Sequence, residues 1–364
     1  MKKESKKRVV VAMSGGVDSS TAAWLLKERG YEVIGATMCI GVMEREPGGP
    51  IRCCSLTDIE DARRVALKIG IPFNVFYFRE EFEKEVIQYF CKEYEQGRTP
   101  NPCIICNEKI KFGIFLKKAF EMGADYIATG HYARLEYNKI INGYVLRKGI
   151  DKKKDQSYVL FSIKKEQFPY ILFPLGDLKK DEVRRKAFEI GLQVYNKRES
   201  QEVCFIQDRT YHTLLSERLR RSIKPGPIMD KNGNVLGTHK GIAYYTIGQR
   251  RGLRIAKGKP LYVIRIDREN NAIIVGDMDD VFGERFIVNS INWIVPGDIP
   301  ETFGAHVKIR YNHPGAEATI YRRGENKVEV VFKSPQKAIT PGQAAVFYDE
   351  DKVLGGGWIK EVIY

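Results

Sequence analysis

The sequence lacks any hydrophobic run long enough to cross a membrane, since no stretch approaches the ~18 consecutive apolar residues that a span needs. No secretory signal is recognisable either, because the basic segment 1–8 is followed by an apolar run too short for the core of a signal peptide. The seven cysteines are an odd number, which in such a chain indicates reduced thiols rather than a disulfide framework. We therefore expect a cytoplasmic protein with no membrane partner. Repeats and low-complexity tracts are also absent.

The composition indicates a large globular protein with a polyanionic partner. At ~150 residues per domain, 364 residues predict two or three domains, and 43% hydrophobic residues are enough to build sizeable cores. The net charge is +14. Between residues 210 and 260 we count eleven Lys and Arg against two acidic residues, so most of the positive excess lies in a short part of the chain. A nucleic acid is the partner that such a basic region favours.

A strand, a glycine turn and a helix start follow one another near the N-terminus. Residues 9–13 are apolar without alternation, as expected for a strand buried on both faces. Ser14-Gly15-Gly16 ends the strand, and a helix begins at Asp18. Free N–H groups and the positive end of the helix dipole would face an anion there. The pattern is neither a Walker A loop nor G-x-G-x-x-G; Ser-Gly-Gly-x-Asp-Ser resembles the pyrophosphate loop of the ATP pyrophosphatases.

The order of the predicted elements defines the fold class. Further strands over 32–39, 72–78 and 125–129 alternate with helices over 57–69, 82–94, 112–122 and 181–190. This alternation predicts an α/β domain with a doubly wound, mostly parallel sheet, in which ligands sit at the carboxyl ends of the strands. From residue 210 turns multiply and short strands with period-two patterning continue to the end. We predict domains over 1–209, 210–282 and 283–364: the catalytic domain, a basic β-rich middle domain and a C-terminal β-barrel.

Two cysteines lie in a C-x-x-C motif, Cys103 and Cys106, after a proline-rich turn. A zinc site would need a second close pair of Cys or His ligands, which the sequence does not offer. A thioredoxin-like dithiol would need a different context. A nucleophilic thiol that is helped by a third cysteine, Cys204, fits the residues best. The spacing alone does not place Cys204 beside Cys106.

The chain resembles the tRNA-specific 2-thiouridylase family over nearly its whole length. The resemblance depends on six segments in order: Ser14-Gly15-Gly16-Val17-Asp18-Ser19, Asn101-Pro102-x-x-x-Cys106-Asn107, Thr129-Gly130-His131-Tyr132, Lys154-Asp155-Gln156-Ser157-Tyr158, Ser200-Gln201-Glu202-Val203-Cys204-Phe205 and Pro341-Gly342-Gln343. It implies ATP-dependent adenylation of the C2 carbonyl of the wobble uridine of tRNA, followed by sulfur transfer from a cysteine persulfide. The products are 2-thiouridine, AMP and pyrophosphate.

The resemblance also implies a role for each matching residue. ATP would be bound by Ala12, Met13, Ser14, Gly15, Gly16, Val17, Asp18, Ser19, Met38 and Gly130. The target base would meet Asn101, Pro102 and Cys103, and the rest of the tRNA would meet His131, Lys154, Asp155, Gln156, Arg310, Tyr311 and Gln343. Cys106 would be the nucleophile and Cys204 the persulfide carrier. We expect Mg²⁺ near Asp18, and a cysteine desulfurase or a sulfur-relay carrier as the sulfur donor.

Position 103 departs from the family, because many members have Asp where this chain has Cys103. Two hypotheses stay open. In the first, Cys106 and Cys204 carry out persulfide chemistry, can close into a disulfide, and Cys103 is a bystander. In the second, Cys103, Cys106 and Cys204 ligate an iron–sulfur cluster with one iron open to the transferred sulfur, although such clusters ordinarily take four cysteines. Two other functions are compatible with the sequence: an amidotransferase or ligase with the same loop, and a nucleotide-regulated tRNA-binding protein.

Overall fold

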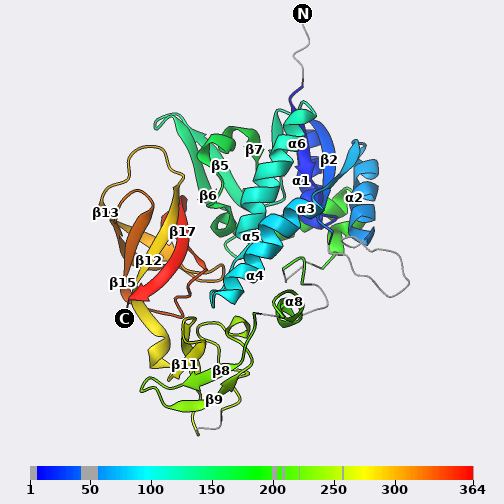
Figure 1. The fold of residues 1–364 in the computed structure, drawn as a ribbon. Helices are drawn as coiled ribbons and strands as arrows, with labels where there is room; N and C mark the ends of the chain where they lie inside the picture. Colours follow the sequence, from blue (N-terminus) through cyan, green and yellow to red (C-terminus); the bar gives the residue numbers. More distant parts are fainter. Residues whose placement is uncertain are drawn as a thin grey trace, which may run out of the picture.

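The computed structural model describes residues 6–41, 56–198, 203–206, 210–220, 222–255 and 258–363. Ser200 to Glu202 of the motif before Cys204 lie outside the described residues, as do two of the seven cysteines, Cys53 and Cys54. Figure 1 shows three parts: an α/β region at the upper right, a β-barrel at the left and a smaller β-region below.

A parallel sheet forms the centre of the first part. Within the described residues it has five strands in the order β3-β2-β1-β4-β7, and every neighbouring pair is parallel. The strands are β1 (Arg8–Ala12), β2 (Glu32–Cys39), β3 (Phe73–Tyr77), β4 (Tyr126–Ala128) and β7 (Ile171–Leu172). The predicted α/β class is therefore confirmed, and the strands over 32–39, 72–78 and 125–129 form close to the expected positions.

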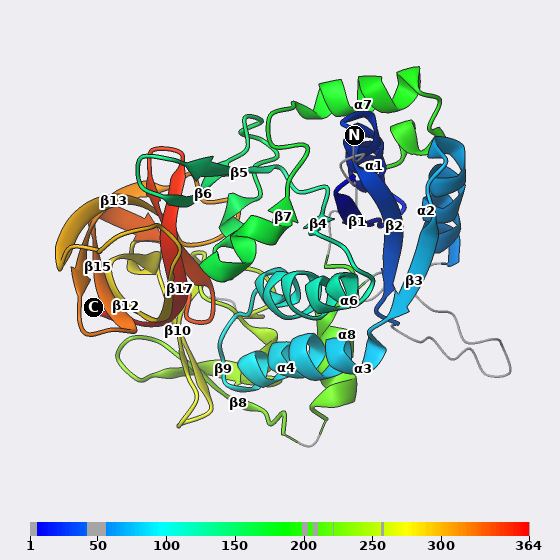
Figure 2. The same ribbon diagram turned by 90° about the horizontal axis from the view of Figure 1, so that it is seen from above.

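Helices cover both faces of this sheet, as Figure 2 shows. Val9 and Val11 pack into the cluster under α1 (Val17–Glu28), α2 (Leu56–Ile69) and α7 (Lys180–Glu189), while Val10 points into the cluster on the opposite face. All three valines are fully buried. Each contributes about 1.5–3 kcal/mol by leaving water, which explains a strand without polar alternation.

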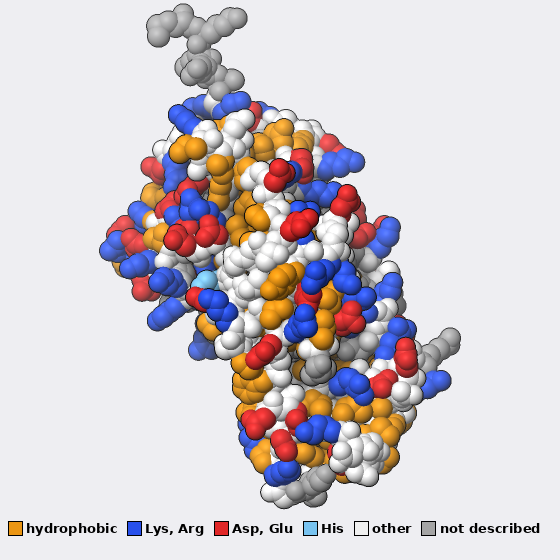
Figure 3. Space-filling model, turned by 90° about the vertical axis from the view of Figure 1, so that its left-hand side faces the viewer, with side chains coloured by type: hydrophobic (Ala, Val, Ile, Leu, Met, Phe, Trp, Pro, Cys, Tyr) orange, Lys and Arg blue, Asp and Glu red, His pale blue; other side chains and the backbone are white. Residues whose placement is uncertain are grey.

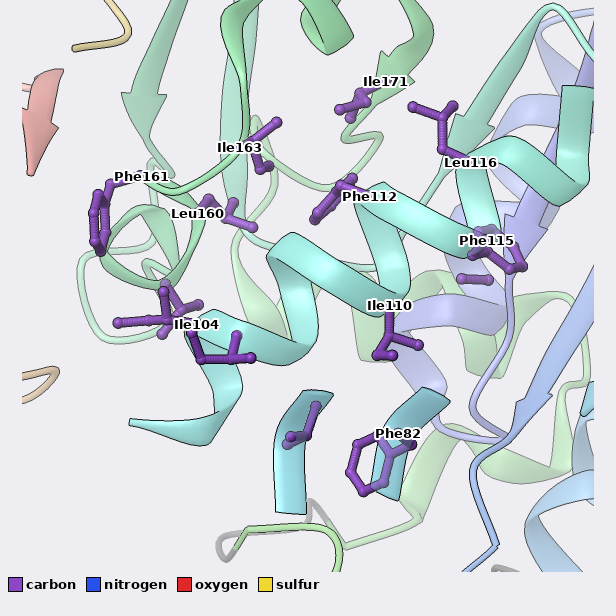
Figure 4. Packing of buried hydrophobic residues seen from close by; sticks show 14 of the residues in the cluster. Phe82, Ile104, Ile110, Phe112, Phe115, Leu116, Leu160, Phe161, Ile163 and Ile171 are labelled. Atoms are coloured by element: carbon purple, nitrogen blue, oxygen red, sulfur yellow. The ribbon is translucent and has the colours of Figure 1, made fainter. Parts of the chain in front are cut away.

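Two long helices cover the second face, and each contains a π-helical stretch. The first runs through α3 (Arg79–Phe82), η1 (Glu83–Ile87) and α4 (Gln88–Glu95). The second runs through α5 (Pro102–Ile105), η2 (Cys106–Ile114) and α6 (Phe115–Glu121). Figure 4 shows apolar side chains of both helices, Phe82 and Ile110 among them, turned toward each other.

The start of the second helix corrects the sequence analysis. A helix was expected only from Phe112, with the C-x-x-C motif on a turn before it. The helix instead begins at Pro102, so both thiols lie on helical turns. Proline is favourable at the first helical position, because its missing N–H has no partner there and its φ already suits a helix. Pro102, predicted to lie in a turn, therefore marks the helix start.

The middle part begins with a helix, which the expectation of an all-β region from residue 210 missed. This helix is α8 (Tyr211–Arg218), with Thr210 as its N-cap. A mixed sheet follows, with strand order β10-β11-β8-β9 in the described residues. Its strands are β8 (Gly226–Met229), β9 (Val235–His239), β10 (Tyr262–Asp267) and β11 (Ala272–Gly276). An eight-residue helix capped by one threonine has too little periodicity to stand out in the sequence.

The C-terminal part is a closed β-barrel, as predicted. The described strands run in the order β12-β15-β14-β13-β16-β17, and β12 also pairs with β17, which closes the ring. They are β12 (Phe282–Trp293), β13 (Thr302–Lys308), β14 (Ala316–Arg322), β15 (Lys327–Lys337), β16 (Ala344–Asp349) and β17 (Lys352–Ile363). Within the described chain, no helix is long and apolar enough to cross a bilayer.

A hairpin of the α/β part joins it to the barrel. Strands β5 (Ala133–Asn138) and β6 (Gly143–Lys148) pair with each other, and β6 meets the start of β17. Figure 2 shows this hairpin beside the barrel. Arg134 and Arg147 both pair with Asp351 at this junction, at 2.5 and 2.6 Å. The first two parts in the sequence and the barrel also share one apolar cluster, so the barrel is packed against the α/β part rather than tethered to it.

Candidate functional site

The glycine turn after β1 has the geometry of a phosphate loop. Gly15 has φ +70°, and a Cβ at this position would lie 2.2 Å from the Asp58 carbonyl oxygen, so only glycine fits. The Ser14 N–H donates to the Ser19 hydroxyl at 3.1 Å, which folds the turn over the helix start. Gly16 is the N-cap of α1 and has no side chain, so the first N–H groups of α1 are left for a ligand. An anion is the ligand that this helix end favours.

Asp18 in this loop is held by two residues that the sequence analysis missed. The Lys180 ammonium lies 2.7 Å from both carboxylate oxygens, and the Tyr132 hydroxyl donates to one of them at 2.7 Å. Lys180 is buried, yet it is the first residue of α7. A cation in the first turn opposes the helix dipole, and that was the one available sequence signal for a special role.

A second lysine, Lys197, binds the glycine turn through a hydrogen bond. The Lys197 ammonium donates to the Gly15 carbonyl oxygen at 3.1 Å and to carboxylate oxygens of Asp58 and Asp61 at 2.7 and 2.6 Å. The turn is thereby tied to the first two turns of α2. This contact joins residues that are far apart in the chain, so no local sequence pattern predicts it.

The four residues after β4 connect three of the predicted sites. A Cβ on Gly130 would lie 2.8 Å from the Ser19 nitrogen, so the chain passes directly against the phosphate loop. The Tyr132 hydroxyl bonds Asp18, and its N–H donates to the Gln156 side chain at 3.0 Å. His131 turns the other way and meets the helix that carries the C-x-x-C thiols. The segment 129–132 therefore links the phosphate loop, the thiol helix and the predicted RNA loop.

His131 is buried and held in one tautomer. Its Nε2 lies 3.4 Å from the Lys111 ammonium, and its Nδ1 lies 2.7 Å from the Thr129 hydroxyl. An ammonium can only donate, so Nε2 is the acceptor and Nδ1 carries the proton. Burial and the Lys111 charge hold the pKa of His131 well below its usual value, so the ring is neutral. Its predicted contact with tRNA stays a prediction, and the ring would have to be uncovered to make it.

Cys103 and Cys106 are free thiols on the helix that begins at Pro102. Burial raises the pKa of Cys106, and Lys111 lowers it. Although Cys103 reaches solvent, burial by its surroundings raises its pKa as well, again opposed by Lys111. The π-helical turn after Cys106 widens the helix, so that a residue five positions on lies closer to the same face than in an α-helix. Lys111, which sequence reasoning missed, is the cation that acts on both thiols.

Cys204 is exposed in the short described segment 203–206. Next to it, Phe205 is buried and packs edge-on against Phe82 and Phe90, with ring centroids 5.8 and 5.3 Å apart. Phe205 thus fixes the segment on the helix from α3 to α4, which contacts the thiol helix. Cys106 packs against the same apolar cluster as this segment. The structure therefore places the segment that carries Cys204 against the helix next to the thiol helix, while a bond between the two sulfurs stays a prediction.

The turn before the thiol helix is contacted by both other parts of the chain, the middle part and the barrel. Gly97 lies against Ile266 of β10, since a Cβ there would be 2.6 Å from its side chain. The Thr99 hydroxyl meets that of Thr246 in the middle part. From the barrel, the Gln343 amide donates to the carbonyl oxygens of Thr99 and Pro100 at 3.0 and 3.1 Å. Gln343, predicted to meet tRNA, is engaged in positioning this turn, and its RNA contact stays a prediction.

The remaining predicted RNA residues gather where the α/β part meets the barrel. Asp155 accepts from the Gly149 N–H and from Ser157, all within 3.1 Å, so its oxygens hold the loop in shape. Arg310 donates to the Lys337 carbonyl oxygen, and the partly exposed Tyr311 stacks edge-on near Tyr158. Lys154 and Gln156 flank Asp155 and are partly exposed. Their contacts with RNA stay predictions.

The surface seen from the barrel side mixes both signs of charge. Figure 3 shows Lys and Arg interspersed with Asp and Glu on this face instead of one uniform basic patch. Among the described residues, no three His, Cys, Asp or Glu side chains stand close enough together to hold a metal ion. Cys103, Cys106 and Cys204 are all described, so the three proposed cluster ligands are not gathered in this conformation.

The chain matches three domain families in sequence. The tRNA methyl transferase HUP domain matches residues 7–208, the tRNA methyl transferase PRC-barrel domain matches 212–277, and the aminomethyltransferase β-barrel domain matches 284–359. The three matches follow the order of the α/β part, the middle part and the barrel.

Full-length relatives are also found. The tRNA-specific 2-thiouridylase MnmA of Acetivibrio thermocellus is 50% identical over 98% of this chain and 100% of its own length. The enzyme of the same name from Halothermothrix orenii is 52% identical over 97% of this chain and 99% of its own. Among solved structures, a 4-thiouridine synthetase–RNA complex with bound ATP is 21% identical, with a TM-score of 0.38 over 59% of this chain and 50% of that one.

Proposed function

The chain belongs to the tRNA-specific 2-thiouridylase family, and from that premise we propose that the site described above performs both steps of tRNA 2-thiolation. ATP adenylates the C2 carbonyl oxygen of the wobble uridine, and sulfur then replaces the adenylated oxygen. The observation that carries the proposal is the segment 129–132, whose residues touch the phosphate loop, the thiol helix and the loop predicted to meet RNA. A reaction with a nucleotide, a thiol and an RNA base needs these three sites to adjoin.

The first step activates a poor leaving group. A uracil carbonyl oxygen does not leave unaided, whereas its AMP ester does. The turn from Ala12 to Ser19 would hold the phosphates through backbone N–H groups, and Met38 and Gly130 would border the rest of ATP. Lys180 and Lys197 lie within hydrogen-bond distance of this loop and would balance charge on the departing pyrophosphate.

Mg²⁺ is proposed as the companion of ATP, and it would neutralise the pyrophosphate. Asp18 offers the oxygen ligands that Mg²⁺ prefers. In this structure, however, Lys180 lies on both carboxylate oxygens. Lys180 would have to give up at least one oxygen to the ion, so the residues fit Mg²⁺ only after that exchange.

The second step transfers sulfur. A cysteine desulfurase or a sulfur-relay carrier would load Cys204 as a persulfide. The terminal sulfur attacks C2 of the adenylated uridine, and AMP leaves with the C–O bonding electrons. The Cys106 thiolate then attacks Sγ of Cys204, which breaks the S–S bond and leaves 2-thiouridine. The two cysteines end as a disulfide, which an external dithiol must reduce before the next turnover. A cytoplasmic location, where tRNA and ATP are present, suits this reaction.

The role of Cys103 separates the persulfide route from the iron–sulfur hypothesis. We favour the persulfide route, because the three cysteines are not gathered in the described residues. Anaerobic purification tests it. A colourless, metal-free enzyme that thiolates tRNA, with Cys103→Asp still active, supports the persulfide route. Iron and labile sulfide near stoichiometric amounts, lost together with activity in Cys103→Ala, would overturn it.

One assay tests the proposed function against its competitors. AMP, pyrophosphate and 2-thiouridine are measured with unmodified tRNA, ATP and a persulfide donor. We expect all three products, with AMP release dependent on tRNA. AMP release that depends on ammonia or an amine would favour an amidotransferase or ligase. If no AMP is released in a tRNA-dependent way, the result would favour a tRNA-binding protein without this activity. Mass spectrometry of wobble nucleosides from a deletion strain is the matching measurement in cells.

A further inference from the structure

Two lysines are half-buried where the α/β part meets the barrel. Lys148 is the last residue of β6, and Lys308 is the last residue of β13. Neither was singled out by the sequence. They come from different parts of the chain. Each lies close enough to the same carboxylate, that of Asp155, for this negative charge to raise the lysine's pKa.

Aromatic rings surround both ammonium groups. The Lys148 ammonium lies 4.4 Å from the centre of the Tyr348 ring and donates to the Glu350 carbonyl oxygen at 2.9 Å. The Lys308 ammonium lies 5.8 Å from the Tyr158 ring and 6.0 Å from the Tyr311 ring. Burial lowers the pKa of both lysines, and the charge of Lys148 lowers that of Lys308 further. Two cations are thus held together at a place that weakens their hydration.

Nearby acidic groups compensate these cations only in part, because Asp155 raises the pKa of both lysines and Asp351 that of Lys148, while burial has the larger, opposite effect. Within the described part of the chain, the Lys308 ammonium contacts the Tyr158 and Tyr311 rings but has no hydrogen bond or ion pair. Asp155 points its oxygens at the Gly149 N–H and at Ser157, and Asp351 pairs with two arginines instead. Placing an ammonium away from water without a close ion-pair partner costs free energy. A ligand that brings further negative charge would offset this cost.

We propose that Lys148 and Lys308 bind one phosphodiester group of the tRNA backbone between the α/β part and the barrel. The proposal rests on tRNA being the substrate. The residues predicted to meet tRNA border the pair on both sides, since Lys154 to Gln156 lie on the α/β side and Arg310 and Tyr311 on the barrel side. A phosphate is a compact anion with several acceptor oxygens, which suits two ammonium groups that converge from different strands. The tyrosine rings limit the access of competing water.

The experiment measures tRNA affinity against salt for the full-length enzyme. The double variant K148M/K308M should lose about tenfold in affinity at low salt, equally for different tRNAs. Its slope of log K against log salt should fall by about 0.7–0.9, the value for one phosphate contact. The double variant K333M/K360M removes the same charge from exposed barrel lysines that pair with Glu317 and Glu361, and should keep the parental slope.

Two further measurements separate this proposal from the proposed function. K308M should raise the melting temperature of the RNA-free enzyme, because it removes a half-buried charge that has no ion-pair partner, and K308R should keep the salt slope. The double variant should still thiolate tRNA at saturating concentrations. An unchanged slope in K148M/K308M, or an equal loss in K333M/K360M, would overturn the phosphate site. Loss of thiolation in the parent enzyme would instead contradict the proposed function.

Discussion

Replacing Asp18 by asparagine is expected to destabilise the protein as well as to stop adenylation. The carboxylate receives both short contacts of the Lys180 ammonium, and the Lys180 side chain is only 8% exposed. Removing one partner of a buried ion pair costs about 3–5 kcal/mol, because the other charge stays buried. The Asp18 side chain is 31% exposed, so water and the asparagine oxygen offset part of this cost, and we expect about 2 kcal/mol.

The assay is thermal unfolding combined with a double-mutant cycle. A loss of about 2 kcal/mol lowers the melting temperature of a domain of this size by about 4–8 °C. Adding Lys180→Met to Asp18→Asn removes the stranded charge, so the double variant should recover most of the stability. It should stay inactive in AMP release, and its tRNA affinity should be nearly that of the parent. An unchanged melting temperature in Asp18→Asn, or no recovery in the double variant, would refute the reasoning.

Three other changes test the site. Gly15→Ala should abolish ATP binding and cost at least about 1–2 kcal/mol, since alanine is strained at φ +70° and its Cβ would overlap a carbonyl oxygen of α2; calorimetry and unfolding check this. Lys111→Met removes the charge that lowers the pKa of the Cys106 thiol, so half-maximal alkylation of Cys106 should move to higher pH. Arg250→Glu with Arg251→Glu should flatten the salt dependence of tRNA binding, because fewer counterions are released.

The Lys111 change has a matched control variant. Lys109 lies on the same helix as Lys111 but is paired with Glu108, so Lys109→Met should leave the alkylation profile where it is. A profile that moves equally in both variants would assign the effect to net charge alone. Normal ATP affinity in Gly15→Ala would mean that the turn has room to open. An unchanged salt slope after the double arginine reversal would remove the middle region from the RNA interface.

Local sequence patterns predicted the parts of the fold that depend on local chemistry. The strand over 9–13, the glycine turn and the alternation of strands and helices all follow from residues that are neighbours in the chain. The predicted start of the thiol helix was wrong, because a proline such as Pro102 is favourable both in a turn and at the first position of a helix. Helix α8 was missed, because tertiary contacts such as the stacking of Tyr211 on Tyr94 support it.

The candidate site was predicted only where motifs name its residues. Lys180, Lys197 and Lys111 lie outside the motifs, and each acts on a residue that the fold brings near from elsewhere in the chain or across a π-helical turn. From the sequence alone, a lysine in a helix is interpreted as a solvated side chain unless its partner is known. The partner is set by topology, so these contacts required the structure.

The turn at 97–100 has a consequence for selectivity, because it is touched by the middle part and by the barrel just before the thiol helix begins. A shift of either outer part would displace this turn and, with it, the first turn of that helix, while the phosphate loop on β1 would stay in place. An RNA fragment that binds only the middle part or only the barrel would therefore leave the thiols misaligned with the target base of that fragment. Discrimination between intact tRNA and its pieces would then need no contact with the base itself.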